Sequence, residues 1–453
     1  MPCCKTGRLY TTKGGIPIQH LSDIHYSILQ LLAECGWVSQ PLLELTGYSY
    51  TYRSRCLKTL LDSQYIRKRG QGRSKAYALT TGGRKVLASY NAQRYRKEIL
   101  EASQKLTRHP ERDVLRGDVA AILSLAGFSV HPDDKPVLPA PIPLSTSVLE
   151  LDAWKAILSN EEWVAYPCEA DQKQYCRKHT AIGCYYDAIA LKEKMPEGNE
   201  GVNYSRACGV LVTPSHLLTV YHSRDVAMML RMTGEQNFQS FLFSGQAFIG
   251  YRPEKRTALV FGSDFTAAIH IIKHHISGRD GSRFVSVRSG KTKNNYKTMK
   301  GGGELLRPGN LGNPTFYLPL WPESLTLLQM MHYPFWQERM ISQITKDVFH
   351  LGCQVKWCFQ QEEYTIYILA ALNLTQIDAA FRSIRDQPGG KFRILCFHWQ
   401  EPFFRELLEP YLPGREIWLT RLPEDYISLL LHDLSTYWRD AVENDSRTDF
   451  RTT

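Results

Sequence analysis

Residues 21–87 read LSDIHYSILQLLAECGWVSQPLLELTGYSYTYRSRCLKTLLDSQYIRKRGQGRSKAYALTTGGRKVL. Ser22 and Ser49 are typical helix N-cap residues, and apolar residues recur at helical spacing after each of them. Between these two helices, Ser39 and Pro41 begin a shorter one, because a proline in the first helical turn loses no hydrogen bond. A Thr-Gly pair then turns the chain. The stretch therefore predicts three helices, the last two joined by a tight turn.

A basic loop between two short strands follows the third helix. Tyr65-Ile66 and residues 76–79 are apolar and aromatic runs typical of strands, and residues 67–75 between them carry five cations and two glycines. A further helical pattern runs from Gly82 to about Gln104. The order of helices, basic hairpin and exit helix is typical of a winged helix-turn-helix domain, which we place at residues 1–105.

The third helix has one apolar stripe, formed by Leu57, Leu60 and Leu61, so its opposite face is expected to point to solvent. In a winged helix-turn-helix this face enters the major groove, and the loop between the strands, called the wing, lies on the backbone or minor groove. The residues expected to contact DNA are Thr51, Tyr52, Arg55 and Lys58 of the helix, and Arg67, Lys68, Arg69, Arg73 and Lys75 of the wing.

Positive charge is concentrated at the N-terminal end of the chain. Residues 1–117 hold 20 Lys and Arg against 8 Asp and Glu, whereas the remainder holds 35 against 37. Because neutralising phosphates releases counterions, a local excess of cations favours a polyanionic partner. We therefore expect double-stranded DNA to be a partner.

The length and composition of the 453-residue chain limit the expected number of domains and the expected cellular compartment. Its length predicts two or three domains. The first residues lack the apolar core of a signal peptide, and no apolar run is long enough to span a bilayer, so no membrane association is expected. Eleven cysteines without a dense framework fit reduced thiols. We expect a cytoplasmic protein without a cofactor.

The rest of the chain predicts a linker followed by an α/β domain. Residues 106–146 contain a helix over 114–126, and then five prolines within 132–143 that exclude regular helix. Residues 147–453 alternate strands with helices and read as one α/β domain, or as two subdomains that divide near residue 250. An antiparallel hairpin is expected over 208–221, and four βα units begin with strands at 257–261, 364–369, 392–397 and 417–419. The overall fold class is multi-domain α/β, and the C-terminal domain is expected to bind a protein partner or to self-associate.

Catalytic or metal-binding patterns are sparse. Asp187, Glu193 and Lys194 resemble the carboxylate and lysine set with which restriction-type nucleases hold a cation and a water. This keeps a metal-dependent nuclease open as an alternative, although residues 192–198 also read as a polar turn. Ser289-Gly290-Lys291-Thr292 lacks the earlier glycine of a P-loop, which would fall at Val285, so an NTPase is excluded.

Three further sets of side chains have a structural interpretation beside the chemical one. Asp264 follows a strand and either binds a ligand or caps the next helix. His270 and His274 are four residues apart on one helix, where neighbouring isoleucines favour packing over metal binding. A zinc site could be formed by Cys168, Cys176, His179 and Cys184, but no Cys-x-x-Cys pair is present. We expect no metal site.

The N-terminal pattern resembles a family of plasmid proteins. From Leu21-Ser22-Asp23, through the wing at 67–75, to Tyr77-Ala78-Leu79-Thr80-Thr81-Gly82-Gly83-Arg84, it is similar to the replication-relaxation proteins of plasmids and integrative conjugative elements. The resemblance implies a winged helix joined to a larger C-terminal domain. It also implies sequence-specific DNA binding in the replication, transfer or transcription of a mobile element. A protein-interaction adaptor that uses the winged helix is the second alternative.

Overall fold

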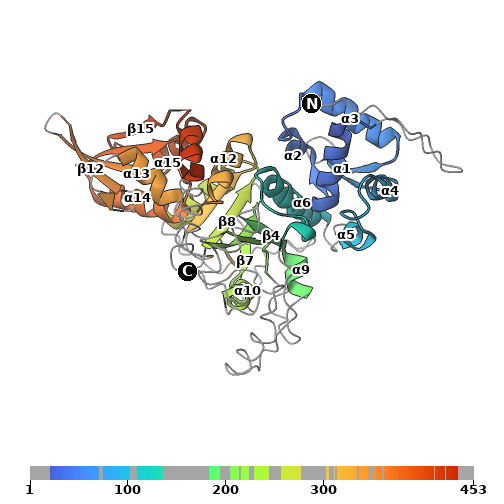
Figure 1. The fold of residues 1–453 in the computed structure, drawn as a ribbon. Coiled ribbons are helices and arrows are strands. Elements are labelled where there is room, and N and C mark those ends of the chain that lie inside the picture. Colours follow the sequence, from blue (N-terminus) through green and yellow to red (C-terminus); the bar gives the residue numbers. More distant parts are fainter. Residues whose placement is uncertain are drawn as a thin grey trace, which may run out of the picture. The chain divides into compact units, whose positions relative to one another are not determined.

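The structure is a computed structural model of the 453-residue chain (Figure 1). It describes residues 21–70, 75–102, 110–135, 183–193, 205–213, 216–223, 229–243, 257–276, 303–305, 311, 314–333, 336–345, 350–351, 354–359, 362–412, 414–423 and 425–436. The chain divides into two compact units, unit 1 at Met1–Leu125 and unit 2 at Ala126–Thr453. Both contain helices and sheets, so the mixed α/β class expected from the sequence is confirmed.

Unit 1 contains helices around a small antiparallel sheet. Its elements are α1 (Asp23–Cys35), β1 (Val38–Ser39), α2 (Gln40–Glu44), α3 (Tyr50–Asp62), β2 (Ile66–Arg69), β3 (Ala76–Leu79), α4 (Thr81–Tyr90), α5 (Lys97–Ala102) and α6 (Pro110–Leu125). The sheet has the order β1-β3-β2, with Ile66 opposite Leu79 and Val38 opposite Tyr77. The two-residue strand β1 was not foreseen from the sequence.

The helices of unit 1 begin where their capping residues predict. Ser22, Ser39 and Ser49 precede α1, α2 and α3, and the Ser49 hydroxyl accepts a hydrogen bond from the Tyr52 backbone N–H at 3.4 Å. Thr80 caps α4 by accepting from the Gly83 N–H at 3.2 Å. A Cβ atom on Gly83 would overlap the Tyr65 carbonyl oxygen, so glycine lets α4 approach the segment between α3 and β2 closely.

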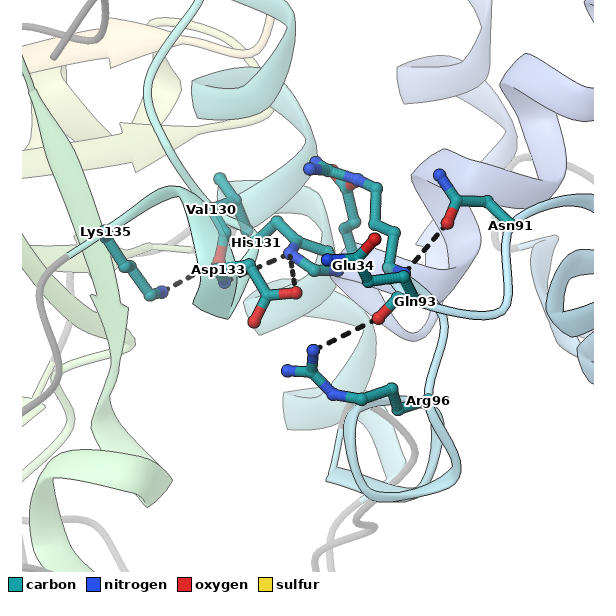
Figure 2. Close-up of polar contacts among 9 residues, drawn as sticks. Glu34, Asn91, Gln93, Arg96, Val130, His131, Asp133 and Lys135 are labelled. Carbon is teal, nitrogen blue, oxygen red and sulfur yellow. Dashed lines mark hydrogen bonds and ion pairs between the residues drawn. The ribbon is translucent and has the colours of Figure 1, made fainter.

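The continuous helix expected over residues 82–104 is wrong, because the structure interrupts it between α4 and α5. The Asn91 side-chain carbonyl accepts the Arg94 backbone N–H at 3.0 Å, and the Arg96 guanidinium donates to the Gln93 carbonyl at 3.1 Å (Figure 2). An asparagine that bonds to nearby backbone offers the chain an alternative to the helical ladder. The helix therefore stops at Tyr90 and resumes at Lys97.

Helix α6 belongs to unit 1, although the sequence placed it in the connecting segment. It packs against α1 and β1. A Cβ atom on Gly117 would overlap the Trp37 carbonyl oxygen, so this glycine is what allows the contact. The buried Asp118 carboxylate accepts the Ser39 backbone N–H at 2.7 Å, and burial raises the pKa of Asp118 to about 7. The first compact unit thus extends about twenty residues beyond the expected boundary at 105.

The described part of unit 2 contains two five-stranded sheets. The first sheet and its helices comprise β4 (Cys184–Asp187), α9 (Ala188–Glu193), β5 (Gly209–Val212), β6 (Leu217–His222), α10 (Met232–Phe243), β8 (Thr257–Gly262), α11 (Thr266–Ile276), β10 (Thr315–Pro319), α12 (Pro322–Met330) and α13 (Trp336–Thr345). The second comprises β11 (His350–Leu351), β12 (Gln354–Phe359), β13 (Glu362–Ile368), α14 (Leu374–Asp386), β14 (Lys391–Cys396), α15 (Glu401–Tyr411), β15 (Ile417–Arg421) and a helix over 426–436. A separate ribbon pairs β7 (Met229–Arg231) with β9 (Gly303–Leu305). Short 3-10 helices span Pro132–Asp134 (η2) and His398–Gln400 (η4).

Both large sheets have the same topology. Three antiparallel strands come first in the chain, and two strands parallel to the third are then added on one side. The spatial orders are β4-β5-β6-β8-β10 and β11-β12-β13-β14-β15. A helix precedes each added strand: α10 and α11 in the first sheet, and α14 and α15 in the second. The hairpin and the four βα units expected from the sequence are present.

The division expected near residue 250 is wrong. Strands β6 and β8 lie on either side of that position in the chain, and they are hydrogen-bonded neighbours, with Val220 opposite Leu259. A boundary there would cut one sheet in half. The change from one sheet to the next falls between β10 and β11. No helix among the described residues is long and apolar enough to cross a membrane.

Candidate nucleic-acid interface

Helix α3 separates an apolar face from a polar one. Cys56, Leu57 and Leu60 are buried in unit 1, and α3 packs against α1 and β2. The four residues expected to contact DNA are all exposed on the other side of the helix: Thr51, Tyr52, Arg55 and Lys58. Leu61 is only half-buried, so the apolar stripe is narrower than its spacing predicts.

A buried arginine fixes the turn that leads into α3. Arg53 is almost fully buried, and its guanidinium donates to the Glu44 carbonyl at 3.3 Å and to the Tyr48 carbonyl at 3.0 Å. It also lies 3.8 Å from the Glu44 carboxylate. Arg53 therefore ties the end of α2 to the start of α3. The sequence held a signal for this role, because Arg53 is four residues before Leu57 and so shares its buried face.

Exposed tyrosines surround the N-terminus of α3. Tyr48, Tyr50 and Tyr52 are among the large hydrophobic side chains exposed in the described part of the chain, and Tyr50 is 66% exposed. The Tyr48 and Tyr52 rings meet edge to face with centroids 6.4 Å apart. Sequence reasoning selected only Tyr52. The cluster adds apolar contact area beside the cations of α3, which suits the bases and sugars of a nucleic acid.

The cations of the expected wing lie on and beside β2. Arg67, Lys68 and Arg69 are exposed on this strand, and Lys75 is half-buried just before β3. Arg73 lies outside the described residues. The Arg67 guanidinium sits 5.0 Å from the centre of the Trp37 ring, which packs against Ala76 and Ala78 of β3. A cation–π contact holds this side chain in place without neutralising its charge.

The exposed cations of α3 and β2 have no acidic partners in the part of the chain that the structure describes. Arg55, Lys58, Lys68 and Arg69 take part in none of its ion pairs, whereas Arg53 and Arg94 are paired with Glu44 and Glu34. The α3 face and β2 therefore carry uncompensated positive charge. Such a surface attracts phosphates.

Two of the three candidate nuclease residues lie in the described part of the chain, at the ends of neighbouring elements. Asp187 ends β4, where its carboxylate accepts the Ile189 N–H at 2.7 Å, and Glu193 is the last residue of α9. Lys194 lies outside the described residues. No group of three or more His, Cys, Asp and Glu side chains suited to a metal ion occurs among the residues described.

The other candidate residues either make ordinary structural contacts or lie outside the described residues. Asp264 accepts the Thr266 N–H at 2.7 Å and so caps α11. His270 is half-buried on α11, and Cys184 is buried in β4. The side chain of His274, the residues Cys168, Cys176 and His179, and the segment at 289–292 lie outside the described residues.

A buried carboxylate that the sequence did not reveal lies beside the first large sheet. Glu235 of α10 accepts hydrogen bonds from the Ser205 hydroxyl at 2.8 Å, the Tyr221 hydroxyl at 2.9 Å and the Arg206 N–H at 2.6 Å. Desolvation raises the pKa of Glu235, against the opposing effect of the Arg206 hydrogen bond. The group joins α10, β6 and the segment before β5, which is a structural role.

No protein-family model, curated protein or solved structure matches this chain.

Proposed function

We propose that this protein binds double-stranded DNA sequence-specifically and that unit 1 is a winged helix-turn-helix domain. The observation that carries the proposal is α3, which is buried through Cys56, Leu57 and Leu60 and exposes Tyr52, Arg55 and Lys58. Helices α2 and α3 with the turn between them form the helix-turn-helix. Strands β2 and β3 are the described part of the wing.

The contact that we assign to each side chain follows from its position on α3 or β2. An α-helix fits the major groove, and residues near its N-terminus reach the base edges, so Thr51, Tyr52 and Arg55 are positioned for sequence reading. Lys58, one turn further along, would contact a flanking phosphate. Lys68 and Arg69 of β2 would contact backbone or the minor groove. Arg53 acts indirectly, because it holds the turn that presents the N-terminus of α3.

The test is binding of the full chain to labelled duplexes from the DNA around its own gene, at increasing salt. Arg55→Ala should reduce the preference for the best site about 5- to 150-fold, because a base contact is worth about 1–3 kcal/mol. Arg69→Ala should weaken binding to all duplexes similarly and lower the slope of log K against log salt by about 0.9.

Lys85→Ala is the matched control, since Lys85 is an exposed cation of unit 1 on α4 and is not among the residues assigned to DNA contact. It should leave both site preference and salt slope nearly unchanged. If all three variants bind as the unaltered protein does, unit 1 does not read DNA through this surface. Weak, sequence-blind binding with little salt dependence would instead favour the protein-interaction adaptor.

The biological setting of this DNA binding is a mobile genetic element, in our proposal. It rests on the resemblance of residues 21–87 to the replication-relaxation proteins, and it places the activity in replication, transfer or transcriptional control of the element. Unit 2 would supply a partner-binding or self-association surface. Co-purification of the protein with the element's origin or promoter DNA, absent for Arg55→Ala, would support this setting.

A further inference from the structure

Four side chains form an aromatic–cation cluster on the second large sheet: Tyr364 of β13, Lys391 and Arg393 of β14, and Trp418 of β15. The Tyr364 and Trp418 rings lean toward each other across β14, with centroids 5.5 Å apart and planes at 34°. The Arg393 guanidinium carbon lies 5.2 Å from the Tyr364 ring centre and 5.1 Å from that of Trp418. The Lys391 amine lies 5.9 Å from the Tyr364 ring centre.

The strand register places the four side chains on one face of the sheet. Arg393 is paired with Trp418 on one side, Lys391 is opposite Tyr364 on the other, and residues two apart on a strand share a face. The alternate residues of β14, Phe392, Ile394 and Cys396, are fully buried on the other face. The face that carries the cluster is open to solvent at Trp418, which is 41% exposed on the edge strand of the sheet.

The cluster is rigid where it is exposed. Tyr364 is only 4% exposed and backs the Trp418 ring, and Arg393 is held against both rings. Because the indole is already supported on one side, little side-chain entropy is lost when a second flat group covers its free surface. The two cations beside it complement negative charge. A flat aromatic ring that carries a phosphate matches this combination.

We propose that the aromatic–cation cluster binds single-stranded nucleic acid, with one base stacked on Trp418 and adjacent phosphates against Lys391 and Arg393. Single strands fit better than a duplex, because the bases of a duplex are already stacked on one another and only an unpaired base can cover the indole. The site is separate from the α3 surface and belongs to a different compact unit. The proposal for this site is therefore independent of the duplex binding proposed above.

The test measures binding of a fluorescent thymidine oligonucleotide of about twelve nucleotides to the full chain at low salt. Trp418→Ala should weaken binding about 10-fold, and Trp418→Phe, which keeps a stacking ring, should retain most of the affinity. Arg393→Ala should also weaken it. An abasic oligonucleotide of the same length should bind the unaltered protein as weakly as the thymidine oligonucleotide binds Trp418→Ala, because the base is what the indole recognises.

Two controls tie the result to this cluster. Tyr90→Ala removes an exposed aromatic ring from α4, and Lys356→Ala removes an exposed cation from β12 of the same sheet; neither should change oligonucleotide affinity. The effect of Trp418→Ala should persist in an Arg55→Ala background, which separates this site from α3. Unaltered affinity of Trp418→Ala, equal binding of abasic and thymidine strands, or no binding by the unaltered protein would each overturn the proposal.

Discussion

The two large sheets of unit 2 share a topology but differ in what covers them. In the first sheet, β5, β6, β8 and β10 are buried along their whole length. In the second sheet, β14 alternates between buried and half-buried residues, and β15 is exposed at Trp418 and Arg421. The same chain path therefore produces one sheet with four fully buried strands and one sheet with an accessible face.

The difference in burial is seen in three residues that are paired across three neighbouring strands of each sheet, which we call a row. In the first sheet Val220, Leu259 and Phe316 lie side by side, and Phe316 is 1% exposed against Trp336 of α13. The corresponding row of the second sheet is Ile366, Arg393 and Trp418. An arginine replaces a leucine, and an exposed tryptophan replaces a buried phenylalanine. Topology thus fixes the position of each residue in the sheet, whereas the covering elements decide whether that position is buried or exposed.

The largest expected effect comes from exchanging the central residues of the two rows. Leu259→Arg would bury an unpaired charge and should destabilise unit 2 by about 4 kcal/mol or more. Arg393→Leu should change stability by about 1 kcal/mol or less, because the position is only half-buried. Urea unfolding followed by tryptophan fluorescence measures both, since eight of the nine tryptophans belong to unit 2. Similar losses in the two variants would show that the sheets are equally buried.

The buried carboxylate of the first sheet should give the next largest effect. Glu235→Ala leaves the Ser205 and Tyr221 hydroxyls and the Arg206 N–H without their acceptor, at a cost of about 3 kcal/mol. Glu235→Gln keeps one carbonyl oxygen for the Arg206 N–H and should cost about 1 kcal/mol. The same urea experiment tests this order. An equal loss for both would mean that the shape of the side chain matters and its hydrogen bonds do not.

Stability should depend on pH in opposite directions for the two sheets. Burial raises the pKa of Glu235, so its contribution is complete below the ordinary glutamate pKa and is lost as pH rises through the raised value. Hydrogen bonds from Arg421 and Arg405 lower the pKa of Glu401 from 4.5 to about 2, so its contribution is present above 4.5 and is lost as pH falls toward 2.

Urea midpoints measured from about pH 3 to about pH 8 separate the two groups. Glu235→Gln should remove part of the decline toward high pH, and Glu401→Gln part of the decline toward low pH. The unaltered chain is the reference for both. A pH profile that neither substitution changes would mean that other groups govern the acid and alkaline limbs.

The smallest effect is expected at an exposed ion pair on β12 and β13 of the second sheet. Lys356 and Glu363 form a 2.6 Å ion pair across β12 and β13, and both side chains are well exposed. Solvent screening leaves such pairs with little net stability, so Lys356→Ala should shift the urea midpoint too little to measure. A clear loss would show that this face is covered in solution.

Much of unit 1 and of the βα pattern could be predicted from the sequence, because its signals are local. The Ser49 and Thr80 hydroxyls cap helices by accepting backbone N–H groups three positions away, the Ser22 N–H donates to the His25 ring at the same spacing, and glycines mark helix ends. The exposed face of α3 followed from the spacing of its leucines. The break at Asn91 is local too, but the sequence does not predict it, because helical periodicity on both sides is a stronger signal than one asparagine.

The sequence by itself determined the element types, the basic N-terminal region and the candidate DNA-contacting face, since each depends on residues within a few positions of one another. Only the tertiary structure decided that α6 packs closely against the segment at Trp37 through Gly117, and that β6 and β8 are neighbours in one sheet. It also decided that the side chains of Tyr364, Arg393 and Trp418 contact one another. These residues are far apart in the chain, and their contacts depend on strand order and register. Local periodicity does not specify which strands become neighbours, so these contacts could not be predicted from the sequence.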